Sequence, residues 1–140
     1  ANDSSNLRSA GAQGNINNAG RLIDLERNIS GLNTLISTLG TDAAEAQTQI
    51  TNTQNSINDL TTRLSAAQAL TPPQVPPPGF DLVNWTSDRN LLVASLQQEL
   101  TTMRSLNQIA TATYNTKVTE INQKRTLLND YVQERTRLSR

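Results

Sequence analysis

The sequence predicts an all-α fold in which two long helices form an antiparallel coiled-coil hairpin joined by a proline-rich loop. Apolar or small residues recur at steps alternating between three and four from Leu22 to Ala67, and all five prolines fall within residues 71–85. A second helical pattern of similar length follows these prolines. A repeat that averages 3.5 residues keeps one stripe on one side of a helix, where another helix buries it. With one Phe, one Trp, two Tyr and one Met, the chain is short of bulk for a globular core.

The N-terminal zone and the first helix differ in composition. Residues 1–19 are rich in Asn, Ser and Gly and hold few apolar anchors, which predicts a flexible or partner-ordered arm. The first helix is expected over residues 20–70 and to continue through Gly40, because the heptad phase passes this glycine without a slip. It is expected to end before Pro72, since proline disfavours a helical conformation in the preceding residue and lacks a backbone donor.

The loop and the second helix follow. We expect a Pro/aromatic loop at the hairpin tip over residues 71–85 and a second helix over 86–140. Thr86 or Ser87 is the expected N-cap, because a hydroxyl oxygen accepts a hydrogen bond from a free backbone N–H of the first turn. Asp88 would then be placed favourably against the helix dipole.

We call the apolar stripe of each helix the seam. The first seam has a single polar member, Thr53, whereas the second is less regular, with two successive steps of four around Tyr114. The second stripe also passes through Val93, Asn107 and Arg125. The predicted seam residues are Leu22, Leu25, Ile29, Leu32, Ile36, Leu39, Ala43, Ala46, Ile50, Ile57, Leu60, Leu64, Leu96, Leu100, Met103, Ala110, Tyr114, Val118, Ile121, Leu128 and Val132.

The sizes of the seam residues predict the register of the hairpin. If the helices return antiparallel around the loop, the numbers of facing residues sum to about 156 or 157, as for Leu60 with Leu96. Small residues then face the bulky ones, and Ala43 makes room for Tyr114. Asp24 and Glu26 come near the region from Arg125 to Arg135. The alternative is a parallel dimer, which an Ile and Leu alternation such as Ile29 and Leu32 also favours.

The residue types argue against catalysis. The chain has no His and no Cys, so the commonest general base, the thiolate nucleophile and the usual zinc ligands are missing. We therefore expect no enzyme activity, no metal, no cofactor and no small-molecule substrate. The net charge is zero and the basic C-terminal stretch is interrupted by acidic residues, so neither nucleic acid nor a membrane surface is favoured as a partner. No apolar run approaches the length of a membrane span, so an integral membrane protein is not expected.

The loop is the one segment suited to recognition. Val75, Phe80, Leu82, Val83 and Trp85 place the only Phe and the only Trp in or beside a proline-stiffened segment, and these five residues are the candidate partner contacts. Two interpretations stay open: the aromatic side chains cap the end of the hairpin, or they contact a protein partner.

The outer helix faces carry amides and hydroxyls instead of the usual Glu and Lys, because Asn, Gln, Ser and Thr make up 56 of the 140 residues. Neutral polar groups are easier to bury against a neighbouring subunit than charges are. The order helix, proline-containing turn, helix resembles secretion-needle subunits in topology, and the composition is similar to that of viral fibres, tails and capsid accessories. We expect a structural subunit that forms a homo-oligomer or packs into a larger protein assembly such as a filament, virion or appendage, with an extracellular or virion-associated location. The alternative is a monomeric, rod-like adaptor that presents the tip loop to a protein partner.

Overall fold

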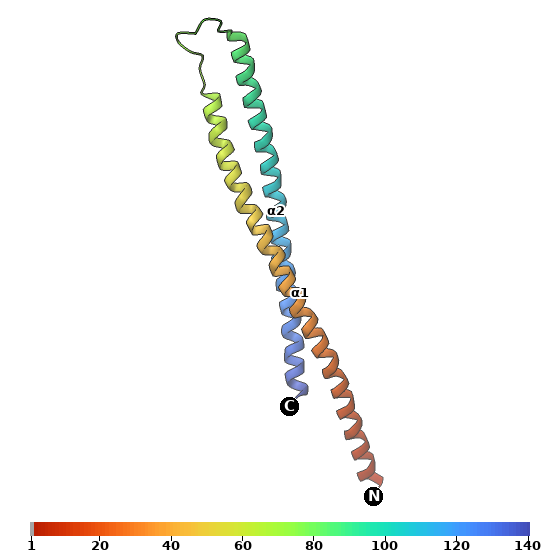
Figure 1. Cartoon of the computed structure of the whole chain (residues 1–140). Coiled ribbons are helices and arrows are strands. Elements are labelled where there is room, and N and C mark those ends of the chain that lie inside the picture. The colour runs from red at the N-terminus through yellow and green to blue at the C-terminus, as the bar shows by residue number, and fades with distance from the viewer. Residues whose placement is uncertain (1) are drawn as a thin grey trace. The chain divides into compact units, whose positions relative to one another are not determined.

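The chain folds as an all-α hairpin of two helices. A computed structural model describes the backbone of residues 2–140 and the side chains of residues 17–140. Helix α1 spans Asn2–Gln68 and helix α2 spans Leu82–Leu138, with the loop between them (Figure 1). The two helices pack against each other, which confirms the predicted fold class. The predicted arm over residues 1–19 lies mostly outside the residues whose side chains are described, and it stays a prediction.

The hairpin divides into two compact units, and each contains a segment of both helices. The first unit is Ala1–Ala43 with Thr116–Arg140, and the second is Ala44–Asn115. In the first unit, Arg21 pairs with Glu134 and Asp42 lies 4.0 Å from Lys117. Rising numbers on α1 therefore meet falling numbers on α2, as antiparallel helices require.

The core of the first unit is a row of apolar side chains along α1 that packs toward α2. Leu25 is fully buried with no exposed surface, and the buried row continues along both helices as Ile29, Leu32, Leu39, Ala43 and Ile121. Glu26 accepts a hydrogen bond of 3.2 Å from Arg135. This contact confirms that Glu26 lies near the segment from Arg125 to Arg135, as the sequence predicted.

The core of the second unit is a cluster built from both helices. Its buried members are Leu60, Ala67, Leu96 and Leu100, and Ile57, Leu64, Val93 and Met103 pack against them. Residues of both helices that the sequence analysis placed opposite each other, such as Leu60 and Leu96, thus belong to one cluster. Ala46 and Ala110, another predicted pair, are also buried.

All predicted seam residues named above are buried or half-buried, whereas Arg125 is exposed. Lys124, one residue earlier, is half-buried in its place. From Tyr114, steps of three, four and three lead to Lys117, Ile121 and Lys124, which are all buried or half-buried. The regular spacing of the buried positions therefore continues where the sequence suggested a stutter. A lysine is tolerated beside a seam because its aliphatic stem packs on apolar surface while the ammonium group reaches water.

The starts of both helices differ from expectation, and α1 begins at Asn2 where a start at residue 20 was expected. α1 runs without a break through Gly31 and Gly40 and ends at Gln68, close to the predicted end. α2 begins at Leu82, four residues before Thr86, so neither Thr86 nor Ser87 is the N-cap. Leu82, Val83 and Trp85 therefore belong to the first turn of α2 and not to the loop. Asp81 is the reason for the earlier start.

Candidate interaction surfaces

Asp81 caps the start of α2. Its Oδ1 accepts hydrogen bonds from the backbone N–H groups of Val83 at 2.9 Å and Asn84 at 3.3 Å. Its carbonyl accepts the first helical hydrogen bond, from Trp85, at 3.0 Å. A capping carboxylate satisfies donors that have no partner within the helix and complements the positive end of the helix dipole.

The only Phe and the only Trp flank this cap. Phe80 precedes Asp81 and Trp85 lies four residues after it, which are the two positions of a hydrophobic staple. Both side chains are half-buried. The guanidinium of Arg89 lies 5.6 Å from the centre of the Trp85 ring, within range of a cation–π interaction, and donates a long hydrogen bond to the Leu70 carbonyl at 3.4 Å. These positions favour a capping role for both aromatic residues.

A tight turn leads the chain into the cap. The N–H of Phe80 donates to the carbonyl of Pro77 at 3.1 Å, which closes a four-residue turn. Gly79 has a φ of 81°, and proline followed by glycine at the central positions is the preferred sequence of a type II turn. Pro78 and Gly79 therefore direct the chain so that Asp81 meets the first turn of α2.

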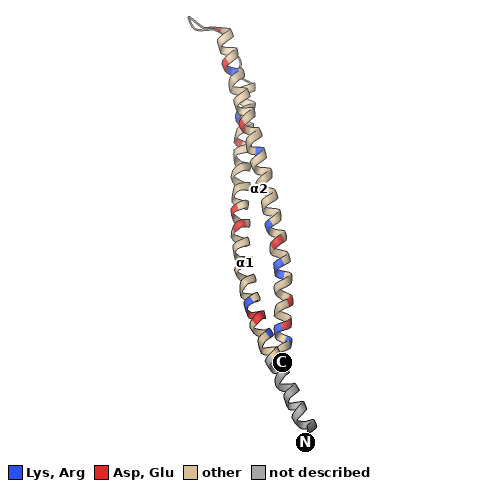
Figure 2. Cartoon of the chain, turned by 90° about the vertical axis from the view of Figure 1, so that its right-hand side faces the viewer, with Lys and Arg blue, Asp and Glu red and all other residues tan. Residues whose placement is uncertain are grey.

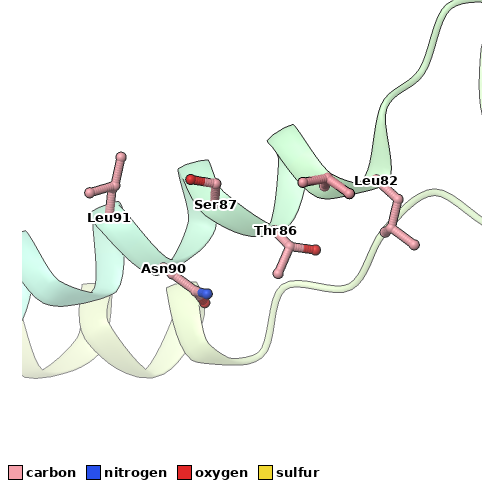
Figure 3. Close-up of a pocket in the computed structure, with 6 residues that line it drawn as sticks. Leu82, Thr86, Ser87, Asn90 and Leu91 are labelled. Atoms are coloured by element: carbon pink, nitrogen blue, oxygen red, sulfur yellow. The ribbon is translucent and has the colours of Figure 1, made fainter.

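An exposed apolar surface lies on the first three turns of α2, and we call it the tip face. Leu82, Val83 and Leu91 are 54%, 76% and 67% exposed, and they line an open hollow. Its other lining residues are Thr86, Ser87 and Asn90, and the labelled residues all come from α2 (Figure 3). The tip face contains no charged side chain, so its desolvation by a protein partner carries no ionic penalty.

The structure separates the five candidate contact residues into two groups. Leu82 and Val83 belong to the tip face, and Val75 in the loop is 88% exposed, whereas Phe80 and Trp85 are half-buried at the cap. Sequence reasoning missed Leu91 because it placed the start of the helix at Thr86. Eight residues span just over two helical turns, so a start at Leu82 puts Leu91 near Val83 on one face.

A second surface runs along α1 on the side opposite the seam, and we call it the outer line. Its members follow steps of four and three and are all small and uncharged: Ser30, Thr34, Ser37 and Thr41 in the first unit, and Ala44, Thr48, Thr51, Asn55, Asn58, Thr62 and Ser65 in the second. Each of these side chains is exposed. Long stretches of both helices carry no charge (Figure 2). The regular spacing is present in the sequence. A search for regularly spaced apolar residues does not detect it, because most of these side chains carry hydroxyls or amides.

The threonines of the outer line already use their hydroxyl protons. Thr48 Oγ1 donates to the Ala44 carbonyl at 3.1 Å, and Thr51 Oγ1 donates to the Gln47 carbonyl at 3.2 Å. Thr34, Thr41 and Thr62 make the same bond to the carbonyl four residues before them. A hydroxyl bonded within its own helix does not lose a donor partner when another surface displaces water from it.

The strongest charge interaction lies in the first unit. Arg21 Nε and Nη2 donate to the two carboxylate oxygens of Glu134, each at 2.8 Å. These hydrogen bonds, with the positive charge of Arg21, lower the pKa of Glu134. The pair is partly exposed, so its contribution to stability is small.

Neither a metal centre nor a membrane span is found within the described part of the chain. No group of three or more His, Cys, Asp or Glu side chains there is placed to hold a metal ion. No helix in the searched residues combines the length and the apolarity needed to cross a membrane.

Comparison of the chain with protein-family models, with curated proteins and with solved structures found no match. Function is therefore inferred from the tip face and the outer line.

Proposed function

We propose that the chain is a non-enzymatic structural subunit, a helical hairpin that packs into a larger protein assembly such as a filament, virion or appendage. The proposal includes an extracellular or virion-associated location. The observation that carries it is the outer line of α1, an exposed, uncharged face whose threonine hydroxyls bond to their own helix.

Burial of the outer line desolvates no charge, and its threonine hydroxyls keep their donor bonds within α1. An unpaired charge is costly to bury, and the outer line has none. Its small side chains allow the backbone of a neighbouring helix to approach closely. An exposed face that faced only water would have no need for this composition, because charged residues support solubility and helix formation better.

The two helices of the second unit present different surfaces, and this difference favours contact between unlike faces. Within the described residues, the exposed large apolar side chains of its helices all lie on α2, including Leu106 and Ile109. In the proposed assembly, α2 of one copy packs its large side chains on the outer line of the next. Contacts between unlike faces of identical subunits repeat to form rings or open filaments.

The test is whether charge on the outer line prevents assembly. We would compare the wild-type chain with a variant carrying Thr48→Lys and Asn55→Glu, which leaves the net charge unchanged. The matched control carries Gln47→Lys and Gln54→Glu, which are exposed and lie one residue earlier on α1. Light scattering and electron microscopy at rising protein concentration are expected to show assembly for the wild type and the control but not for the outer-line variant.

The second candidate is a monomeric adaptor that presents the tip to a protein partner. The tip face favours it, because an uncharged apolar surface on one helix end is typical of a protein contact. A wild-type chain that stays monomeric at every concentration would contradict the structural subunit and support the adaptor. Equal assembly of the outer-line variant and its control would also count against the outer line as the contact.

A further inference from the structure

We propose that Asn107 and Thr53 form a polar layer that sets the register in which α1 and α2 pair in the second unit. Asn107 Nδ2 donates to Thr53 Oγ1 at 3.0 Å and to the carbonyl of Ile50 at 3.2 Å. Both hydrogens of the amide are therefore used, and both acceptors lie on the opposite helix.

Thr53 is oriented for this role by its own helix. Its hydroxyl donates to the carbonyl of Gln49 at 2.7 Å, and this bond leaves the oxygen free to accept from Asn107. The two amide hydrogens of Asn107 thus meet these acceptors only when Asn107 lies beside Ile50 and Thr53. The sum of 156 or 157 expected for facing residues pairs Thr53 with Met103, so the contact of Thr53 with Asn107 is a finding of the structure.

The loop does not impose the register. The 13 residues between Gln68 and Leu82 reach much further than the gap between two packed helices. A displacement of one heptad moves one helix by about 10 Å along the other, which a loop of this length can follow.

The apolar seam favours one register by the sizes of its residues, but it opposes a slip less strongly than the polar layer does. Displacement of α2 by one heptad places Asn107 beside Ile57 and Leu60, and it keeps leucine, isoleucine and methionine in contact along most of the seam. The amide of Asn107 then has no acceptor among these side chains, and the hydroxyl of Thr53 loses its donor. A single polar residue in a helical seam selects the register in this way, because every other alignment buries it without a partner.

The test removes the polar layer without leaving an unpaired group. We would introduce Asn107→Leu together with Thr53→Val into the full chain and measure the distance between spin labels attached at positions 47 and 98. Gln47 and Gln98 are exposed in the second unit, on different helices and offset along the axis, so a slip changes their separation. The wild type is expected to give one distance, and the double variant is expected to give at least two, about 10 Å apart along the helix axis.

Two controls separate register from stability. Asn55→Leu with Thr51→Val makes the same chemical change on the outer line and is expected to keep the single distance. Thr53→Asn with Asn107→Thr exchanges the partners and is expected to keep it as well. A single unchanged distance in the variant without the layer would overturn the proposal. An unfolded double variant, seen by circular dichroism, would overturn it too, because the layer would then maintain the fold and not its register.

Discussion

Arg21 and Glu134, which lie 113 positions apart in the sequence, form a two-pronged ion pair in which both hydrogen bonds measure 2.8 Å. The pair joins α1 to α2 in the first unit. It gives that unit a polar contact between helices, as Asn107 and Thr53 do in the second. The alignment of the hairpin is thus marked by charge in one unit and by a neutral amide in the other.

The Glu134 carboxylate makes the stability of the hairpin dependent on pH. Because its pKa is lower in the folded chain than the ordinary value of 4.5, the interaction is fully present above that value and is lost as the pH falls through the folded-state pKa. When the pH is lowered from about 7 to about 3, the unfolding free energy of the Glu134→Gln variant is expected to fall by less than that of the wild type. Urea titrations at both pH values measure this loss. Glu45→Gln, at an exposed carboxyl, is the control and should behave as the wild type does.

Leu25 is the most sensitive site of the core. Its side chain is fully buried, so Leu25→Ala is expected to lower the unfolding free energy by about 2–5 kcal/mol through lost burial and a cavity. Ile23→Ala is the control, because Ile23 is 57% exposed and lies two residues earlier on α1. Its effect should stay within about 0.5 kcal/mol. Similar losses at both positions in urea denaturation would contradict the placement of the seam.

Asp81 is expected to stabilise the start of α2. Asp81→Ala removes the carboxylate that accepts from Val83 and Asn84, and it should cost about 1 kcal/mol. Asp88→Ala, within α2, serves as the control and should cost less, because Asp88 is past the N-cap. Thermal denaturation followed by circular dichroism compares the two. An equal effect would indicate a later helix start, as the sequence had suggested.

Two glycines should respond in opposite directions to alanine. Gly40 lies inside α1 with open space around the added methyl group, so Gly40→Ala is expected to raise the unfolding free energy by about 1 kcal/mol. Gly79 has a φ of 81°, which L-residues rarely adopt, so Gly79→Ala should lower it by about 1 kcal/mol. Melting temperatures of the two variants measure the contrast. A stabilised Gly79→Ala variant would show that the turn at Pro77–Phe80 is absent in solution.

That two long helices return on each other around a proline-rich loop could be predicted from the sequence alone. Steps of three and four mark a helix stripe and proline ends a helix, because these signals act locally, and the antiparallel return placed Leu60 and Leu96 in one core. The outer line was equally readable from its spacing. It was missed because its members are hydroxyls and amides.

Details that depend on distances between residues far apart in the chain emerge from the packed helices and not from the sequence. It placed Asn107 against Thr53, exposed Arg125 in favour of Lys124, and moved the start of α2 to Leu82. Several residues near the tip were chemically able to cap α2, and the turn at Gly79 selected Asp81 among them. Spacing along a sequence ranks such candidates poorly, because a hydrogen bond forms or fails over a few tenths of an ångström.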